Sequence, residues 1–328
     1  MITTIVSFIQ TAVCHGTPLL FGSTGEIITQ KSGNMNLGIP GIMYVGGISG
    51  TLGAFLYESN AGDAFNPFLA VLIPFLCAVI GSLLMSLIYC FLVVTLRANQ
   101  NVTGLALTTF GVGLGNFFGG SIVKLTGSDA PVVAFPKTTE LYHSSLPFAK
   151  DMGPIGELLF SYSTMIYLAI AIAIVSTVVI SKTRVGLHLR AVGESPATAD
   201  AAGINVTAYK YGATCIGGVI AGLGGLYYVV DFIGVWSNNG FGDRGWLAIA
   251  LVIFALWKPT IGIFGSFLFG GLYILYLRIP GLGRPAQALF QMAPYLVTVL
   301  VLILISVRRK RENQPPESLG LPYFREER

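Results

Sequence analysis

Runs of apolar residues, most of them as long as a helix that crosses a bilayer, dominate this sequence. A helix needs about 20 such residues to cross the hydrocarbon core. The runs lie near residues 2–21, 37–57, 67–94, 102–122, 159–181, 208–230, 245–257, 259–278 and 286–307. Because nearly all of the chain lies in or between these runs, we predict an all-α bundle of transmembrane helices that crosses the membrane many times.

The composition excludes a soluble protein. Only 10% of the 328 residues are charged, whereas an ordinary soluble domain has about 25%, so there are too few charges to cover a surface that faces water. The net charge of +4 is too small to indicate nucleic-acid binding. The four cysteines lie inside apolar runs and form no Cys-x-x-Cys pair, so we expect neither a zinc site nor a disulfide framework.

The number of spans is predicted as 8–10, with residues 1–307 forming one transmembrane domain. The seventh run is short and stops at Trp257-Lys258-Pro259, which indicates a half-helix or a re-entrant segment. Residues 22–36 are polar and glycine-rich, and whether they too are buried stays open. The first run has no positive charge before it and no small-residue cleavage site after it, so we interpret it as a span and not as a signal peptide.

The distribution of lysine and arginine indicates the orientation. Residues 308–311 read Arg-Arg-Lys-Arg, and such clusters stay on the cytoplasmic side of a membrane. Counting back through nine spans puts the polar loop 182–207, and most of the basic residues, on that same side. We therefore predict a cytoplasmic C-terminus, with residues 308–328 as a basic and then polar tail. An outside N-terminus depends on the odd number of spans.

The loop 182–207 differs from the other connections because it contains signals for a helix of its own. Ser195-Pro196 has the form of a helix start with proline in the first turn. Residues 197–202 include strong helix formers, and Gly203 stands where a C-terminal cap belongs. We predict a short amphipathic helix that lies at the cytoplasmic face without inserting into the membrane.

Glycine, with 41 residues in all, recurs at every fourth position in several predicted spans. The repeats comprise Gly111, Gly115 and Gly119, then Gly218 and Gly222 with Gly217, Ala221 and Gly225 beside them, and Gly46 with Gly50. Small residues at this spacing let helix backbones approach closely in lipid, where no hydrophobic force drives association. Two interpretations stay open: the glycines only pack the bundle, or they form surfaces along which helices slide past one another.

Several kinds of chemistry are missing from the sequence. It has no P-loop for ATP hydrolysis, and the interiors of the predicted spans contain no Asp, Glu, Lys or Arg, which ion-coupled carriers usually place at mid-membrane. His15, His143 and His188 are scattered over a span and two loops, and His15 is interpreted as a packing residue. We expect no catalytic residues, no metal site and no cofactor. The chain is then either a passive pore or one subunit of a machine that a partner drives.

Four segments resemble the signatures of one protein family. They are residues 25–43, 186–204, 244–250 and 259–262. In order and spacing they look like the conserved segments of the permease subunits of ABC importers for nucleosides and simple sugars. Gln30 and Pro40 stand where that family usually has glutamates, so no role in substrate binding is carried over to these two positions. The resemblance covers roughly residues 15–305.

The resemblance implies the all-helical permease fold shared with ribose and branched-chain amino acid importers, in the lipid of a bacterial cell membrane. It implies a pathway formed with a second permease subunit, often a non-identical homologue. It also implies cytoplasmic ABC ATPase subunits that grip a coupling segment, and an extracytoplasmic binding protein or lipoprotein that delivers the substrate. The coupling residues that it indicates are Gly193, Glu194, Ser195, Pro196, Ala201 and Gly203.

Interrupted helices indicate where a pathway lies, because irregular backbone at membrane depth is tolerated only where it lines a cavity or is buried in protein. Two such places stand out, at residues 33–41 and 238–245. The candidate pathway residues are Asn34, Asn36, Phe110, Asn238, Asn239 and Phe241. Their amides would bond sugar hydroxyls or base edges, and their rings would stack on a ring. The alternative is ordinary helix capping by asparagine and lipid-facing phenylalanine.

The favoured hypothesis is the permease subunit of a nucleoside importer, driven by ATP hydrolysis on separate subunits. Simple sugars and riboflavin are alternative substrates within the family. A stand-alone passive channel or uniporter is the alternative outside it. An intramembrane enzyme is disfavoured because the sequence contains no catalytic cluster.

Overall fold

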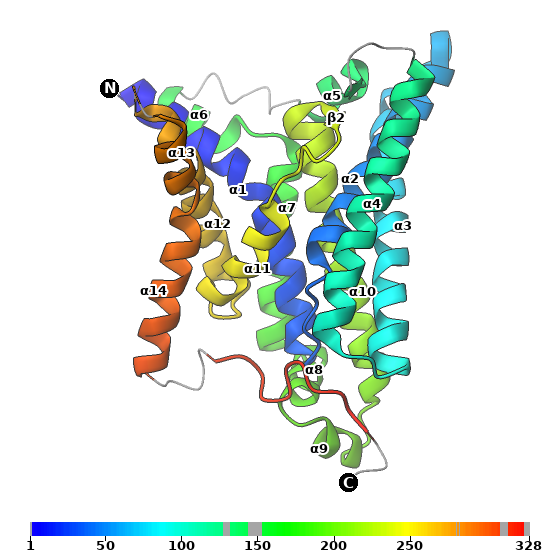
Figure 1. Cartoon of the computed structure of the whole chain (residues 1–328), viewed down its shortest axis with the longest axis vertical. Coiled ribbons are helices and arrows are strands. Elements are labelled where there is room, and N and C mark those ends of the chain that lie inside the picture. Colours follow the sequence, from blue (N-terminus) through cyan, green and yellow to red (C-terminus); the bar gives the residue numbers. More distant parts are fainter. Residues whose placement is uncertain are drawn as a thin grey trace.

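A computed structural model describes residues 2–126, 132–143, 153–279, 281, 283–308 and 314–324. In these ranges the chain forms a bundle of long helices that run roughly along one axis (Figure 1). The first helix starts at the upper end in this view. Residues 314–324, which we call the tail, lie at the lower end (Figure 1).

The elements are as follows. The long helices are α1 (Ile2–Lys31), α2 (Ile39–Ala61), α3 (Pro67–Cys90), α4 (Gln100–Thr126), α7 (Thr164–Lys182), α10 (Val206–Leu226), α12 (Pro259–Ile274) and α14 (Ala293–Arg308). The shorter helices are α5 (Pro136–Tyr142), α6 (Gly153–Phe160), α8 (Arg184–Glu194), α9 (Pro196–Ala201), α11 (Arg244–Phe254) and α13 (Arg284–Gln291). Short 3₁₀-helices are η1 (Gly62–Ala64) and η5 (Leu275–Arg278), and short π-helices are η2 (Phe91–Thr95) and η4 (Tyr227–Ile233). Strands β1 (Val132–Ala134) and β2 (Val235–Ser237) pair antiparallel.

The all-α transmembrane fold predicted from the sequence is confirmed. Among the described residues, seven helices are long and apolar enough to cross a membrane, and the bent pair of α13 and α14 makes an eighth. The seventh apolar run contains α11, which has only 11 residues and follows the non-helical residues 238–243. It is therefore too short to cross a membrane by itself, which fits both the half-helix and the re-entrant segment that the sequence indicated.

The first span is longer than its apolar run. α1 continues beyond residue 21 and ends at Lys31, and the added turns are buried. Glu26, Thr29 and Gln30 make these turns polar, but their side chains face other helices and not lipid. Hydropathy cannot distinguish the two situations. The open question about residues 22–36 is thus answered: they are buried, and only 32–38 form an irregular connection to α2.

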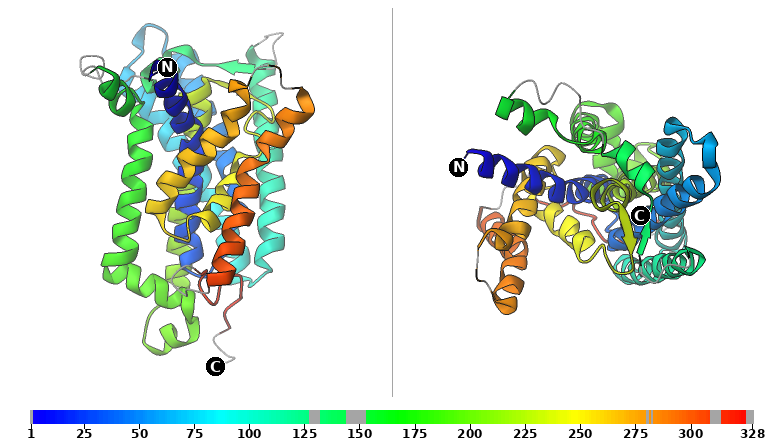
Figure 2. Two further views of the ribbon diagram at one scale, coloured as in Figure 1. Left: turned by 90° about the vertical axis from the view of Figure 1, so that its left-hand side faces the viewer. Right: turned by 90° about the horizontal axis from the view of Figure 1, so that it is seen from above.

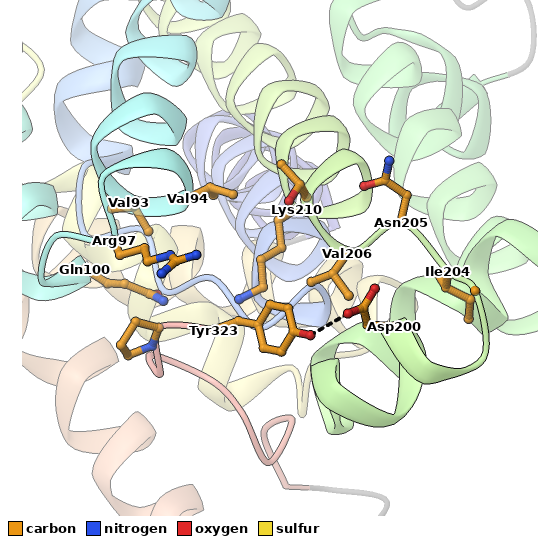
Figure 3. A pocket seen from close by; sticks show the side chains of 13 residues that line it. Val93, Val94, Arg97, Gln100, Asp200, Ile204, Asn205, Val206, Lys210 and Tyr323 are labelled. Carbon is orange, nitrogen blue, oxygen red and sulfur yellow. Dashed lines mark hydrogen bonds between the residues drawn. The ribbon is translucent and has the colours of Figure 1, made fainter. Parts of the chain in front are cut away.

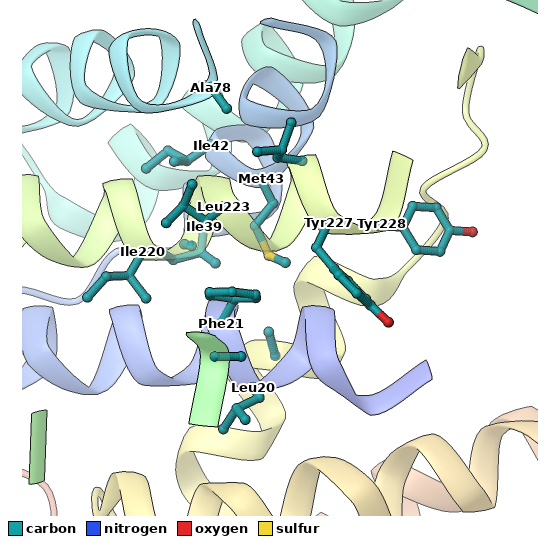
Figure 4. Packing of buried hydrophobic residues seen from close by; sticks show 14 of the residues in the cluster. Leu20, Phe21, Ile39, Ile42, Met43, Ala78, Ile220, Leu223, Tyr227 and Tyr228 are labelled. Atoms are coloured by element: carbon teal, nitrogen blue, oxygen red, sulfur yellow. The ribbon is translucent and has the colours of Figure 1, made fainter. Parts of the chain in front are cut away.

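The apolar core lies where α1, α2 and α10 meet. Figure 4 shows Phe21 of α1 close to Met43 of α2 and Leu223 of α10. Lipid is as apolar as these side chains, so van der Waals packing, and not the hydrophobic effect, holds the helices together. Close and complementary packing is therefore the main requirement at this centre.

The glycine repeats bring helix backbones into direct contact. A methyl group on Gly46 of α2 would overlap the backbone of Gly222 in α10, and one on Gly111 of α4 would overlap Gly41 of α2. Gly217 faces α1 in the same way. The close packing predicted from the four-residue spacing is confirmed.

Gly225→Ala is expected to destabilise the bundle by about 1–3 kcal/mol, the usual cost of overpacking. The new methyl group would overlap the carbonyl oxygen of Met43, a backbone atom that cannot turn aside. Thermal unfolding in detergent measures the change. Gly113→Ala in α4 is the matched control, because no atom lies within 4 Å of the position of its new methyl group. Equal unfolding temperatures for the two variants would contradict the prediction.

Two interrupted spans meet inside the bundle. Residues 32–38 connect the end of α1 to the start of α2, and residues 238–243 lead from β2 down to α11 (Figure 1). The two helix starts touch, since a methyl group on Gly245 of α11 would overlap Pro40 of α2. Figure 1 and the right-hand view of Figure 2 place α11 between α4 and α14 on one side of the bundle. We call this side the α4–α14 face.

Candidate functional site

Two buried carboxylates lie inside spans for which the sequence predicted none. Glu26 is 0% exposed in α1, and Asp231 is buried in η4, the turn that continues α10. The expectation of span interiors without charged residues is therefore wrong. It failed because Glu26 lies in the polar extension of α1, and because Asp231 lies one residue beyond the apolar run 208–230.

Glu26 organises the first interruption. Its Oε1 accepts a hydrogen bond from Gln30 Nε2 at 2.8 Å and another from the backbone N–H of Asn36 at 3.0 Å. Gln30 Oε1 in turn accepts from Trp257 Nε1 at 2.5 Å. This relay ties α1 to the loop 32–38 and to the turn between α11 and α12.

Asn34 and Asn36 lie together at this interruption. Asn34 Nδ2 donates to Thr214 Oγ1 of α10 at 3.0 Å, and Asn36 Oδ1 accepts from the N–H of Gly38 at 2.9 Å. Within the described residues, Glu26 Oε2, Asn34 Oδ1 and Asn36 Nδ2 are buried without a hydrogen-bond partner. Unpaired buried polar atoms are costly, so these three side chains, the lower cluster, have spare capacity to bond a polar group.

Asn239 and Phe241 belong to a second group, in which Asn239 bonds helical residues that lie 123 and 195 residues before it in the sequence. The Tyr44 hydroxyl donates to Asn116 Oδ1 at 2.5 Å and accepts from the N–H of Asn239 at 2.8 Å. Asn116 Nδ2 donates to Asn239 Oδ1 at 3.0 Å. Arg244 donates to the carbonyl of Phe241 at 2.9 Å. We call these five residues the upper cluster.

Aromatic rings surround the upper cluster. Tyr44 meets Trp236 edge to face with ring centres 5.1 Å apart, and Phe241 meets Tyr228 at 5.0 Å. The guanidinium carbon of Arg244 lies 4.2 Å from the centre of the Tyr228 ring. Cation–π attraction of this kind is stronger where water is excluded, and it holds Arg244 at the start of α11.

Asn238 and Asn239 are exposed although they lie at membrane depth. Asn238 accepts a hydrogen bond from Trp236 Nε1 at 3.3 Å. Asn239 bonds Asn116, a residue of the span 100–124. At 1.5 Å per helical residue, Asn116 lies about 12 Å from the end of that span. Irregular backbone cannot face hydrocarbon at that depth. The α4–α14 face therefore meets water or another protein chain.

Phe110 is not brought to either cluster. Its ring is 51% exposed on α4, whereas the next residue, Gly111, packs on Gly41 of α2. Successive residues of a helix are turned by about 100° from each other, so Phe110 points away from this contact. The predicted pathway residues thus divide into a lower pair, an upper group and Phe110 alone.

The short helix predicted in the loop 182–207 is confirmed. α9 starts after Ser195, whose side chain accepts a hydrogen bond from the N–H of Thr198, and Pro196 occupies its first position. Ala201 is its last residue. Gly203 has a φ of +82°, a conformation in which most residues with a side chain would be strained.

A second helix, α8, precedes α9 and was not predicted. Thr183 caps its start by accepting a hydrogen bond from the N–H of Gly186 at 3.1 Å, and Glu194 is its last residue. Gly193 packs directly on the end of α1, because a methyl group there would overlap the carbonyl oxygen of Lys31. The α8–α9 segment therefore touches the same interruption that carries the lower cluster.

Comparison with known proteins places the chain in a family. Residues 8–305 match the family described as branched-chain amino acid transport system / permease component. The chain belongs to this permease family. Membership implies ATPase and binding-protein partners in general.

Three relatives of the permease align over nearly their whole length. The nucleoside ABC transporter permease protein NupC of Lactococcus lactis is 31% identical over 93% of each chain. The guanosine ABC transporter permease protein NupQ of Bacillus subtilis is 32% identical over 100% of this chain and 99% of its own. TsgC13 of Haloferax volcanii, provisionally named as a glucose ABC transporter permease protein, is 31% identical over 97% of each chain.

The tail of the permease returns to the bundle. Ser318 Oγ donates to the carbonyl of Gly193 at 2.5 Å. The N–H of Gly320 donates to the carbonyl of Gly33 at 3.1 Å. The tail thus fastens the end of α8 to the first interruption.

Three members of the upper cluster, Tyr44, Asn116 and Arg244, were not among the predicted residues. Arg244 stands directly before the seventh apolar run, and an arginine at the start of a half-helix was a signal that could have found it. Tyr44 and Asn116 lie within uninterrupted helices, so no local pattern marks them.

Proposed function

We propose that this permease forms the pathway of an importer for nucleosides, which an extracytoplasmic binding protein delivers. The observation that carries the proposal is the upper cluster, where amides and aromatic rings lie at membrane depth on the α4–α14 face. Amides can bond ribose hydroxyls and base edges, and bases stack on aromatic rings. The names of NupC and NupQ support the same class of substrate.

Sugars are the second candidate substrate. The name of TsgC13 refers to glucose, and the amides of Asn116 and Asn239 would bond sugar hydroxyls equally well. The aromatic rings around the upper cluster favour a nucleoside, because a base has a π-face for stacking and a sugar has none.

Two exposed regions of the permease are assigned to partners. A second permease subunit, a non-identical homologue, would cover the α4–α14 face and complete the pathway. Separate ATPase subunits would bind the α8–α9 segment and hydrolyse ATP. In this arrangement the α8–α9 segment and the tail face the cytoplasm of a bacterial cell. That orientation depends on the basic run 308–311, of which residues 309–311 lie outside the described residues.

Reconstitution tests the proposal. Purified in mild detergent, the permease should retain its ATPase subunits. In proteoliposomes with the binding protein, it should take up radiolabelled guanosine only when ATP is supplied. Uptake of glucose without uptake of guanosine would replace the nucleoside by a sugar. Flux through this chain alone, without ATP, would show a passive channel instead.

Asn116→Ala is expected to raise the KM for guanosine uptake by about tenfold, which corresponds to the loss of about 1.4 kcal/mol of hydrogen bonding. It removes the acceptor of Tyr44 and a donor to Asn239. Initial uptake rates in proteoliposomes give the KM. Asn60→Ala is the control, because Asn60 bonds the carbonyl of Leu56 in its own helix. An unchanged KM for Asn116→Ala would remove the upper cluster from the pathway.

A further inference from the structure

A cavity of about 420 Å³ lies at the lower end of the bundle (Figure 3). Its walls come from η2 and the start of α4, from α9 and the first turn of α10, and from the tail. It contains no member of the lower or the upper cluster. Its size is within the range of about 300–1,000 Å³ that is typical of small-molecule sites.

Lys210 points into this cavity from α10 (Figure 3). The residue is only 3% exposed. In the part of the chain that the structure describes, its ammonium group has neither a hydrogen bond nor an ion pair. The ammonium group opens on the cavity, where an anionic acceptor would give it a charge-assisted hydrogen bond. Among the described residues, the cavity therefore has one strong donor for which no acceptor is present.

Arg97 reaches the same space from the turn between η2 and α4 (Figure 3). Its backbone has a φ of +58°, which few residues with a side chain adopt. Its guanidinium carbon lies 4.8 Å from the centre of the Phe324 ring in the tail. Two positive groups that share one cavity repel each other, and an anion between them would turn that repulsion into attraction.

The backbone of α10 adds to the positive potential. Val206 and Thr207, in its first turn, line the cavity, and the free N–H groups and dipole of a helix start favour an anion. Asp200 is the acidic residue of the wall. Its Oδ2 accepts a hydrogen bond from the Tyr323 hydroxyl of the tail at 2.8 Å (Figure 3), so this carboxylate already has a donor and fastens the tail to α9.

We propose that the cavity binds a phosphate group between Lys210 and Arg97, at the start of α10. Ammonium and guanidinium groups both form strong, charge-assisted hydrogen bonds to phosphate oxygens. The rest of the ligand would lie against Pro322 and Tyr323 of the tail. The phosphate belongs either to a nucleoside monophosphate in solution or to the headgroup of an anionic phospholipid. In both cases the bound ligand holds the tail against α9 and restrains the α8–α9 segment.

Titration of the full-length chain with AMP, in dodecyl maltoside, tests the soluble source. This detergent carries no phosphate. We expect saturable binding and a higher unfolding temperature. The Kd should rise about tenfold or more in Lys210→Met and in Arg97→Gln, because each loses a charge-assisted hydrogen bond. Lys182→Gln, at the end of α7 and outside the cavity, is the matched control and should bind like wild type. If Lys210→Met does not fold, the Kd of Arg97→Gln for AMP tests the proposal without it.

Addition of phosphatidylglycerol to the same detergent solution tests the lipid source. If the headgroup is the ligand, native mass spectrometry should show one lipid retained by wild type and lost from both cavity variants, and AMP should not bind. The proposal is overturned if neither ligand binds, or if the cavity variants bind like wild type. It is also overturned if Lys182→Gln loses as much affinity for the ligand as the two cavity variants do. In that case the loss of any basic residue would weaken binding, whether or not the residue lies in the cavity. None of these binding measurements depends on which substrate the permease transports.

Discussion

Replacing Gly193 by alanine is expected to lower ATP-driven uptake by about tenfold or more while the chain still folds in the membrane. The added methyl group would overlap the carbonyl oxygen of Lys31 and crowd the N–H of Gly33. Both are backbone atoms that cannot turn aside, so α8 must move off the end of α1. If ATPase subunits drive the permease through the α8–α9 segment, this shift loosens the contact by which their motion reaches the first interruption.

Uptake and ATP hydrolysis, measured in the same proteoliposomes, separate coupling from folding. We expect the ATPase rate of Gly193→Ala to persist while its uptake falls. Gly212→Ala is the control, because no atom lies within 4 Å of its new methyl group in α10. Wild-type uptake by Gly193→Ala would show that the contact between α8 and α1 transmits no motion.

Glu26→Ala is expected to destabilise the bundle by about 1–3 kcal/mol for each donor that it leaves unpaired, and to abolish uptake. Those donors are Gln30 Nε2 and the N–H of Asn36. The substitution also breaks the relay to Trp257, so the loop 32–38 loses its connection to the turn between α11 and α12. Thermal unfolding and uptake assays measure the two effects.

Glu26→Gln is the informative companion because it keeps an oxygen acceptor in the same place. We expect it to unfold at a higher temperature than Glu26→Ala and to retain part of the uptake. Full uptake by Glu26→Gln would show that the hydrogen bonds matter and that the ionisable group does not. Normal stability and uptake in Glu26→Ala would show that the relay does not hold the interruption in place.

Sequence reasoning succeeded where an element depends on its own residues. Ser195, Pro196 and Gly203 define both ends of α9, because capping involves atoms only a few residues apart. The four-residue spacing of glycines predicted close packing for a similar reason: a helix face without side chains permits a close approach whichever helix lies opposite. The two interruptions were also found locally, from clusters of asparagine and glycine.

Contacts between distant segments could not be predicted in this way. Glu26 and Gln30 lie in a stretch that is too polar to be taken for a span, yet other helices enclose them. Asn116 bonds Tyr44 and Asn239, which are 72 and 123 residues away in the sequence. The residues next to Asn116 in the sequence give no sign of these two partners. Phe110 was chosen for its ring alone, and a residue type does not fix the direction in which its side chain points.

The tail also sets the order in which the lower end can be completed during synthesis. Ser318 bonds Gly193, which precedes it by 125 residues. At about 5–20 residues per second, the end of α8 exists for about 6–25 s before its partner in the tail has been made. If ATPase subunits bind the α8–α9 segment as proposed, one that docks within that time would meet an unfastened segment. The α8–α9 segment bonded to the tail is thus a property of completed chains, and growing chains do not yet have it.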